Sequence, residues 1–129
     1  MECASGIRNK MKIFGDDYNT PDGTCLRDYI HVTDLAKAHI AALKKINDNQ
    51  FSYINLGTGR THSVYDVINT TQTITSRKIN FSVVGRREGD PTSLYSSSAL
   101  AKKEWNWVAD SSNLENIIKT TWNVYKTLI

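Results

Sequence analysis

A strand, a helix and a second strand follow one another closely between residues 51 and 83, and this succession constrains the fold most strongly. Residues 51–56 form a short apolar run closed by a glycine-rich turn. Residues 79–83 alternate between apolar and polar side chains, which is the period of a half-buried strand. Ser63 is the predicted N-cap of the helix between them. Its apolar face is formed by Val64, Val67, Ile68, Thr71 and Ile74. Short loops between these segments predict a βαβ unit with parallel strands.

Further elements are predicted before this unit. Residues 11–14 form a brief strand, residues 16–24 are rich in Asp, Asn, Pro and Gly and form a surface loop, and residues 26–32 are extended. A helix over residues 33–46 follows, with Thr33 as its N-cap. The apolar residues that recur at helical spacing in it are Leu35, His39, Ala42, Leu43 and Ile46. We therefore expect this face to be buried.

Two helices are predicted after the unit. A short one lies near residues 98–104, and a longer one ends the chain. Ser112 and Glu115 have the spacing of a capping box for the last helix. Its apolar face is formed by Leu114, Ile117, Ile118, Trp122, Tyr125 and Leu128. The pattern as a whole predicts one small α/β domain over residues 1–129, with short strands and about four helices.

Composition excludes several classes of protein. The chain has 129 residues, is 40% hydrophobic and 22% charged, and carries a formal net charge of +3. These values are typical of one globular domain with a modest core. The basic residues are scattered rather than gathered in a stripe, which argues against nucleic-acid binding. No signal peptide and no apolar run of membrane-spanning length is present. With two cysteines that lack disulfide-framework spacing, the sequence predicts a cytoplasmic protein without a membrane partner.

The residue types that often carry catalysis form no clear site. The Gly-Thr-Gly turn at residues 57–59 precedes a helix, as a phosphate-binding loop would. However, His62 stands in place of the third glycine of the dinucleotide fingerprint, so an ordinary turn is favoured. The three histidines lack the close spacing of metal ligands, and His39 is expected to be partly buried and hydrogen-bonded. Nothing near Cys25 marks it as an activated nucleophile. We predict neither a metal site nor a catalytic residue.

Two arginines are more informative. Arg27 lies in the extended segment 26–32, and Arg87 follows the strand over residues 79–83. A guanidinium presents a planar fork of donors that fits the oxygens of a phosphate or a carboxylate two at a time. Two forks from separate segments would suit a diphosphate. Alternatively, Arg27 could pair with Asp28 and Arg87 with Glu88 as surface ion pairs of small value. The residues alone leave both interpretations open.

Several stretches of the sequence resemble a known family. They are SGIRNK (5–10), IFGDDYNTPDGTCLRDYIHVTDLAKAHIAAL (13–43), YINLGTG (53–59), SVYDVI (63–68) and GRREGDP (85–91). In order and spacing they resemble the C-terminal part of the UDP-glucose 4-epimerases, which are extended short-chain dehydrogenase/reductases. The R-D-Y-x-H element alone occurs widely in nucleotide-sugar enzymes, but D-G-T before it and R-R-E-G-D after it make the resemblance specific. It covers essentially the whole chain.

The resemblance implies a UDP-sugar-binding site. Arg27 and Arg87 match the two arginines that hold the diphosphate, and Asp90 matches the acid that binds the ribose hydroxyls, as a carboxylate with several acceptor positions can. The matches that pack beside the nucleotide or line its pocket are Lys12, Phe14, Tyr29, Val64 and Leu94. The other residues of the 85–91 segment are expected to shape the turn that presents Arg87 and Asp90. Leu94 has an intermediate size at a position that limits N-acetyl groups, so we expect some tolerance of UDP-N-acetylhexosamines.

The resemblance also implies what this chain does not supply. In the family, the glycine-rich NAD loop and the catalytic Tyr-x-x-x-Lys belong to an N-terminal Rossmann domain, and neither motif occurs here. We therefore expect a C-terminal substrate-binding domain that is inactive alone. The intact enzyme, commonly a homodimer, would interconvert UDP-glucose and UDP-galactose through a 4-keto intermediate with bound NAD, in galactose metabolism. The alternatives are a UDP-pentose (xylose or arabinose) 4-epimerase domain and a non-catalytic binding or interaction domain.

Overall fold

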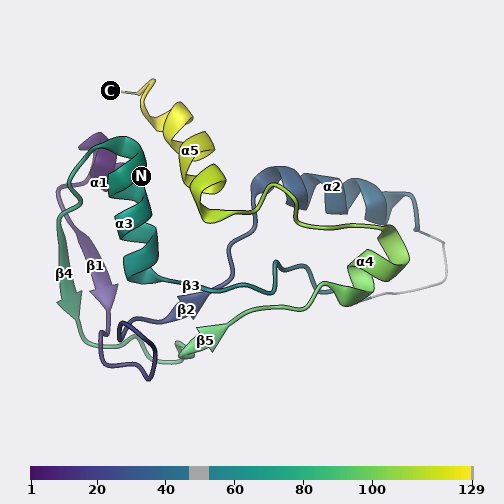
Figure 1. Ribbon diagram of the computed structural model, residues 1–129, viewed down its shortest axis with the longest axis horizontal. Coiled ribbons are helices and arrows are strands. Elements are labelled where there is room, and N and C mark those ends of the chain that lie inside the picture. The colour runs from purple at the N-terminus through teal and green to yellow at the C-terminus, as the bar shows by residue number, and fades with distance from the viewer. Residues whose placement is uncertain (47–52, 129) are drawn as a thin grey trace.

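The computed structural model of the chain describes residues 1–46 and 53–128, which form five helices and five short strands. The helices are α1 (Glu2–Ser5), α2 (Val32–Leu43), α3 (Val64–Thr75), α4 (Ala99–Trp105) and α5 (Leu114–Tyr125). The strands are β1 (Met11–Phe14), β2 (Leu26–Arg27), β3 (His62–Ser63), β4 (Phe81–Val84) and β5 (Ser93–Leu94). Figure 1 shows β1 and β4 beside α1 and α3 at one end of the molecule, and α2 and α4 at the other. The prediction of a small α/β fold is confirmed.

The strands form two separate sheets. β1 and β4 are parallel, in a register that places Phe14 opposite Val84. β2 lies between β3, to which it is antiparallel, and β5, to which it is parallel. Because parallel strands end at the same edge, the segments after β1 and β4 leave their sheet together. These are the surface loop over residues 16–24 and the segment over residues 85–91, and their meeting point positions the candidate site.

The strand expected over residues 51–56 is not observed where the chain is described. Its first two residues lie outside the described residues, and residues 53–56 form no strand. The predicted βαβ unit is therefore wrong in its pairing, since the parallel partner of β4 is β1. Ile54 and Leu56 pack instead against a buried cluster of Ala38, Ala101 and Trp107. The apolar side chains of this segment therefore pack against helices rather than in a sheet.

Helix α2 begins one residue earlier than predicted and has a different cap. Its N-cap is His31, whose ring Nδ1 accepts a hydrogen bond of 3.0 Å from the backbone amide of Thr33. Thr33 thus lies inside the first turn, which also contains the acidic residue Asp34. A histidine nitrogen can satisfy an orphan amide of a helix N-terminus as the oxygen of Ser or Thr does. The helix ends at Leu43.

The buried face of α2 is not the apolar face. Its buried residues are Asp34 and Ala38, whereas the exposed residues on and just after the helix include Val32, Ile40, Leu43 and Ile46. His39 is exposed too, although its Nδ1 lies 2.7 Å from the Leu35 carbonyl oxygen and is hydrogen-bonded as expected. The helix is confirmed, but the expected burial of its apolar stripe is wrong at His39, Leu43 and Ile46, which are exposed.

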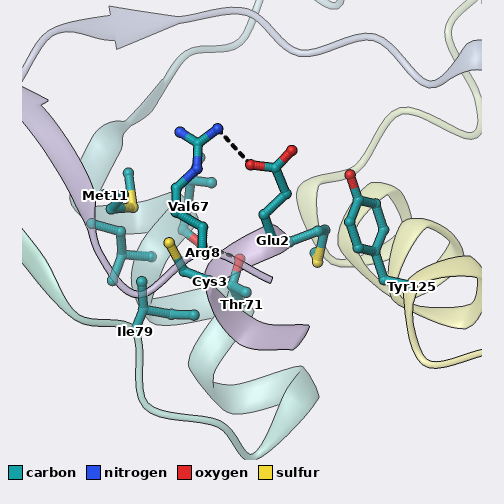
Figure 2. Close-up of a pocket in the computed structure, with 10 residues that line it drawn as sticks. Glu2, Cys3, Arg8, Met11, Val67, Thr71, Ile79 and Tyr125 are labelled. Atoms are coloured by element: carbon teal, nitrogen blue, oxygen red, sulfur yellow. Dashed lines mark hydrogen bonds and ion pairs between the residues drawn. The ribbon is translucent and has the colours of Figure 1, made fainter. Parts of the chain in front are cut away.

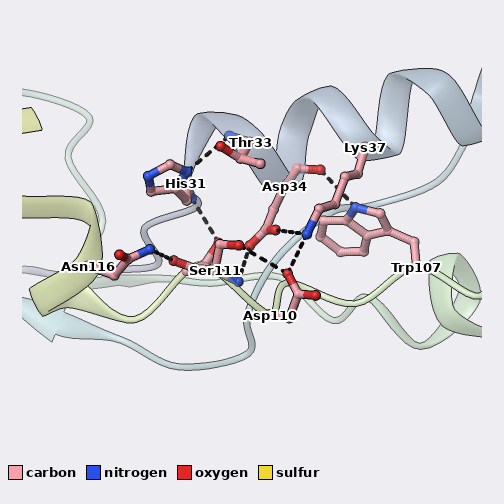
Figure 3. Close-up of polar contacts among 9 residues, drawn as sticks. His31, Thr33, Asp34, Lys37, Trp107, Asp110, Ser111 and Asn116 are labelled. Atoms are coloured by element: carbon pink, nitrogen blue, oxygen red, sulfur yellow. Dashed lines mark hydrogen bonds and ion pairs between the residues drawn. The ribbon is translucent and has the colours of Figure 1, made fainter. Parts of the chain in front are cut away.

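Asp34 explains why the other face turns inward. Its carboxylate is fully buried and accepts hydrogen bonds from Ser111 N at 2.8 Å and Ser112 Oγ at 2.6 Å, while its backbone oxygen accepts from Trp107 Nε1 at 2.8 Å. Figure 3 shows this network between α2 and the segment that follows α4. A buried carboxylate is tolerated when hydrogen bonds replace its hydration. The network therefore fixes α2 through polar contacts.

Because Ser112 takes part in this network, another residue caps α5. The N-cap is Asn113, whose side chain accepts a 2.7 Å hydrogen bond from Asn116 N, so the predicted capping box of Ser112 and Glu115 is wrong. Ser112 is buried and also accepts a 2.8 Å hydrogen bond from His31 N. By contrast, Ser63 caps α3 as predicted, in a capping box with Asp66.

Helices α3 and α5 pack on one another beside the β1/β4 sheet. The buried cluster at this end consists of Ala4, Ile13, Ile68 and Ile79. From the predicted apolar face of α5, Leu114 and Ile118 are buried, whereas Leu128 lies beyond the helix and is 64% exposed. The cluster anchors β1 and thereby fixes the position of Phe14 at its end.

Candidate functional site

The predicted site residues gather where the strands end, and the first pair that meets is Phe14 and Arg87. Phe14 is the last residue of β1, and Arg87 lies three residues beyond β4. The guanidinium carbon of Arg87 is 4.3 Å from the centroid of the Phe14 ring, within the range of a cation–π interaction. This contact places the guanidinium over the ring. The exposed edge of Arg87 can still donate hydrogen bonds to an anion.

Arg27 and Asp90 form the second pair. Arg27 Nη2 lies 3.3 Å from Asp90 Oδ1, and Arg27 Nη1 donates a 2.7 Å hydrogen bond to the carbonyl of Leu26. The two side chains are 21% and 26% exposed, so the pair is partly shielded from solvent. The alternative of a surface pair between Arg27 and the adjacent Asp28 is not what the structure shows. The acid that Arg27 meets comes from the segment that carries Arg87.

The turn over residues 85–91 is fastened to the loop after β1. Asp90 N donates a 3.3 Å hydrogen bond to Arg87 O, and Gly89 closes the turn with a φ of 78°. Arg86 Nε lies 2.7 Å from Asp17 Oδ1, and this hydrogen bond lowers the pKa of Asp17. The Arg86 guanidinium also stacks on Tyr18. The two arginines thus differ in their contacts, since Arg86 holds the loop, whereas the Arg87 side chain contacts Phe14.

Leu94 and Tyr29 lie beside Arg27. In the β2/β5 pairing Leu94 is opposite Arg27, and its side chain is 58% exposed. Tyr29 follows Arg27 by two residues and is half-buried. Burial raises the pKa of its phenol, the Cys25 thiol adds to this, and the Arg27 charge acts against it. Both residues are therefore placed next to the Arg27–Asp90 pair.

Lys12 and Val64 are the outlying members of the predicted set. Lys12 is exposed on β1, two residues before Phe14, so the two side chains leave the strand on the same face. Val64 is the first residue of α3 and packs partly against the cluster that contains Ile13. Its backbone amide donates a 3.0 Å hydrogen bond to Thr24 Oγ1. Val64 thus contacts the core and Thr24.

Asp28 is a structural residue that the sequence reasoning missed. Its carboxylate accepts hydrogen bonds from Thr58 N at 2.9 Å, Thr58 Oγ1 at 2.5 Å and Gly59 N at 3.1 Å, and Ser96 N lies 3.5 Å away. A carboxylate of the chain thus takes the amides that a phosphate would need in this loop. The ordinary-turn interpretation of residues 57–59 agrees with this geometry, and the loop does not fit a dinucleotide phosphate. No local signal in the sequence indicates this role, because the partners of Asp28 lie 30 and 31 residues away.

A separate cavity of about 280 Å³ lies under α1. Figure 2 shows its wall, formed by Cys3, Met11, Val67, Ile79 and Tyr125 among others, with the Glu2–Arg8 ion pair drawn beside it. Its lining includes none of the eight predicted residues. The candidate site is instead an open surface at the ends of β1, β2, β4 and β5.

Residues 1–46 and 53–128 offer no metal site of the usual kind. They contain no group of three or more His, Cys, Asp or Glu side chains placed to hold a metal ion. None of the helices they form combines the length and the apolar character required to cross a bilayer.

Comparisons with known proteins include several UDP-glucose 4-epimerases. Residues 3–57 match the NAD dependent epimerase/dehydratase family. The chain is 42% identical to the UDP-glucose 4-epimerase of Corynebacterium glutamicum over 122 residues. It superposes on UDP-glucose 4-epimerase from Bifidobacterium longum in complex with NAD⁺ and UDP with a TM-score of 0.91 and 36% identity. For the UDP-Glc/GlcNAc 4-epimerase from Campylobacter jejuni the TM-score is 0.84 and the identity 39%.

The alignments cover nearly all of this chain but only part of each relative. The alignments span 95% of this chain for the C. glutamicum relative and 98% for each of the two structures. They span 37%, 37% and 38% of those proteins, respectively. The resemblance to UDP-glucose 4-epimerases is confirmed over nearly the whole chain, and the chain spans a little over a third of each relative.

Proposed function

We propose that residues 1–129 form the UDP-sugar-binding domain of a UDP-glucose 4-epimerase. The observation that carries the proposal is the meeting of the Phe14–Arg87 and Arg27–Asp90 pairs around one short segment of chain. An aromatic ring, two guanidinium groups and a carboxylate are the groups that a nucleoside diphosphate requires. Similarity to enzymes of this kind over 95% of the chain supports the same conclusion.

Each group has a defined task in this proposal. Arg27 belongs to β2 and Arg87 to the segment after β4, so their two forks approach a diphosphate from separate parts of the chain, and each can donate charge-assisted hydrogen bonds. The Asp90 carboxylate accepts hydrogen bonds from the two ribose hydroxyls. Lys12, Phe14, Tyr29, Val64 and Leu94 form the surroundings of the nucleotide and the sugar. These residues bind and do not react.

Chemistry belongs, in this proposal, to the part of such a protein that this chain does not span. The longer protein would interconvert UDP-glucose and UDP-galactose through a 4-keto intermediate, and NAD would be held outside residues 1–129. That assignment agrees with the loop at residues 57–59, whose amides are bound to Asp28. Binding energy from the unreacting nucleotide would place the sugar at the reacting centre. Homodimerisation of the longer protein is part of the same proposal.

Calorimetric titration of the chain with UDP, UMP and uridine tests the binding function. The two arginines predict that affinity falls in the order UDP, UMP, uridine, because each step removes a phosphate that a guanidinium can hold. Equal affinity for UDP and uridine, or no binding of UDP, would contradict the proposal.

A chimera tests the link to epimerase activity. Residues 1–129 would replace the matching segment of the C. glutamicum enzyme, and the conversion of UDP-galactose to UDP-glucose would be measured. Retained turnover supports the assignment. A folded chimera that binds UDP but has no turnover would favour the non-catalytic alternative.

A further inference from the structure

The Arg27–Asp90 contact places an acid beside the proposed diphosphate site. Arg27 uses one terminal nitrogen for its own backbone and the other for Asp90, at 2.7 and 3.3 Å respectively. A phosphate that contacts Arg27 would therefore lie close to a carboxylate of the same sign. Because both side chains are mostly shielded, at 21% and 26% exposure, solvent screens this repulsion less than it would at an open surface.

The acid is also held in place. The Asp90 backbone amide donates to Arg87 O at 3.3 Å, in the turn closed by Gly89, so Asp90 is part of the structure that presents Arg87. The contact with Arg27 Nη2 holds the carboxylate itself beside that guanidinium. The repulsion therefore applies to any polyphosphate that uses both arginines.

Ribose hydroxyls can compensate for this repulsion. An ionised carboxylate has two oxygens that accept hydrogen bonds, and two neighbouring hydroxyls can donate to both of them. A ligand with a ribose next to its diphosphate can donate hydrogen bonds to the Asp90 carboxylate. A polyphosphate without a ribose has no such donors and is only repelled by the negative charge of Asp90.

We propose that Asp90 is a specificity-determining residue that selects nucleoside diphosphates against inorganic polyphosphates. The proposal rests on the UDP-binding function above and extends it. Arg27 and Arg87 attract any diphosphate. Asp90 lowers the affinity for a diphosphate by charge repulsion, unless a ribose is present to hydrogen-bond its carboxylate. Free pyrophosphate and similar anions are thereby kept from occupying the site.

The test compares Asp90→Asn with Glu88→Gln in the full chain. Asn keeps the shape of Asp and removes its charge. Glu88→Gln removes an equal charge from an exposed position in the same turn. Each variant and the unchanged chain are titrated with inorganic pyrophosphate, UDP and 2′,3′-dideoxy-UDP, and circular dichroism verifies folding.

The expected result is a change of selectivity. Asp90→Asn should bind pyrophosphate about fivefold more tightly, since a nearby like charge at partial burial is worth about 1 kcal/mol. Its affinity for UDP should fall, because a neutral amide accepts hydroxyl hydrogen bonds more weakly. The preference for UDP over dideoxy-UDP should shrink in this variant and persist in Glu88→Gln.

Two outcomes overturn the inference and are distinguishable. If the unchanged chain binds UDP but Asp90→Asn binds pyrophosphate no more tightly, Asp90 does not select and the UDP-binding function stands. An equal gain in Glu88→Gln would have the same meaning, because it would reflect overall charge. If the unchanged chain binds neither UDP nor pyrophosphate, the proposed function itself fails.

Discussion

Arg86 stacks on Tyr18, with its guanidinium carbon 4.2 Å from the ring centroid, while its neighbour Arg87 stacks on Phe14 at 4.3 Å. Two consecutive arginines thus rest on two aromatic rings from the end of β1 and the loop that follows it. Arg86 is also bound to Asp17, whereas the Arg87 side chain makes no ion pair with the residues that the structure describes. Arg86 therefore fastens the turn to the loop after β1, and in the proposed function Arg87 is the arginine that binds the diphosphate.

Replacing Asp28 should destabilise the chain. Asp28→Ala leaves the amides of Thr58 and Gly59 without their acceptor, and we expect the free energy of unfolding to fall by about 2–3 kcal/mol. Asp28→Asn keeps one acceptor oxygen and should lose less. Urea denaturation followed by tryptophan fluorescence measures both. Equal stability of Asp28→Ala and the unchanged chain would show that these hydrogen bonds contribute nothing.

Acid should weaken the contact between α2 and the segment after α4. The hydrogen bond from Lys37, at 2.7 Å, lowers the pKa of Asp110 from 3.8 to about 2. A lowered pKa means that Asp110 contributes stability above pH 3.8, and that this contribution is lost as the pH falls towards 2. Melting temperatures of the chain and of Asp110→Asn should therefore differ above pH 3.8 and converge near pH 2. A constant difference across this range would exclude Asp110 as the cause.

The exposed stripe of α2 should make the chain self-associate. Val32 and Leu43 on α2 and Ile46 just after it are 73%, 68% and 66% exposed, and exposed apolar groups favour interaction or aggregation where they adjoin one another. Leu43→Lys should reduce association in sedimentation velocity experiments without lowering the melting temperature. Val124→Lys, at a 61% exposed position on α5, is the matched control and should change association less. A larger reduction of association in Val124→Lys than in Leu43→Lys would place the self-association surface on α5.

Leu94 should limit the size of the sugar. Its side chain is 58% exposed next to Arg27, so a larger residue would reach into the space beside the proposed sugar site. In the C. glutamicum chimera, Leu94→Tyr should lower turnover of UDP-GlcNAc at least tenfold, about the value of excluding one poorly fitting group. Turnover of UDP-glucose should change little, and Leu94→Met serves as the size-matched control. An equal loss with both sugars would remove Leu94 from the specificity account.

Local features of the fold could be predicted from the sequence. The strand at residues 11–14 and the Ser63 cap depend on neighbouring residues, and both are confirmed. The strand predicted over residues 79–83 is found at Phe81–Val84, but its alternation does not give the buried face, because Phe81 and Val83 are both 39% exposed. The inward face of α2 could not be predicted in this way. Asp34 is buried because Ser111 and Ser112, almost eighty residues later, supply its hydrogen bonds. The amphipathic pattern contains no information about such distant partners.

In the candidate site, too, local features could be predicted and contacts between distant residues could not. The fork of Arg27 suggests an anion, but its contact with Asp90, which lies 63 residues away, has no local signal in the sequence. Only the resemblance to a known family assigns these two residues to one site. The role of Asp28 is hidden because an acid beside an arginine suggests a local ion pair, whereas its carboxylate binds the distant loop at residues 57–59.

Calorimetric titration of UDP into Arg87→Ala tests the central claim most directly. Removing the stacked guanidinium should weaken UDP binding by about 1.5–3 kcal/mol, the value of charge-assisted hydrogen bonds. Arg77→Ala, which removes the same charge from an exposed position after α3, should bind UDP like the unchanged chain. Unchanged UDP affinity in Arg87→Ala, with the fold intact, would contradict the assignment of this surface as the diphosphate site.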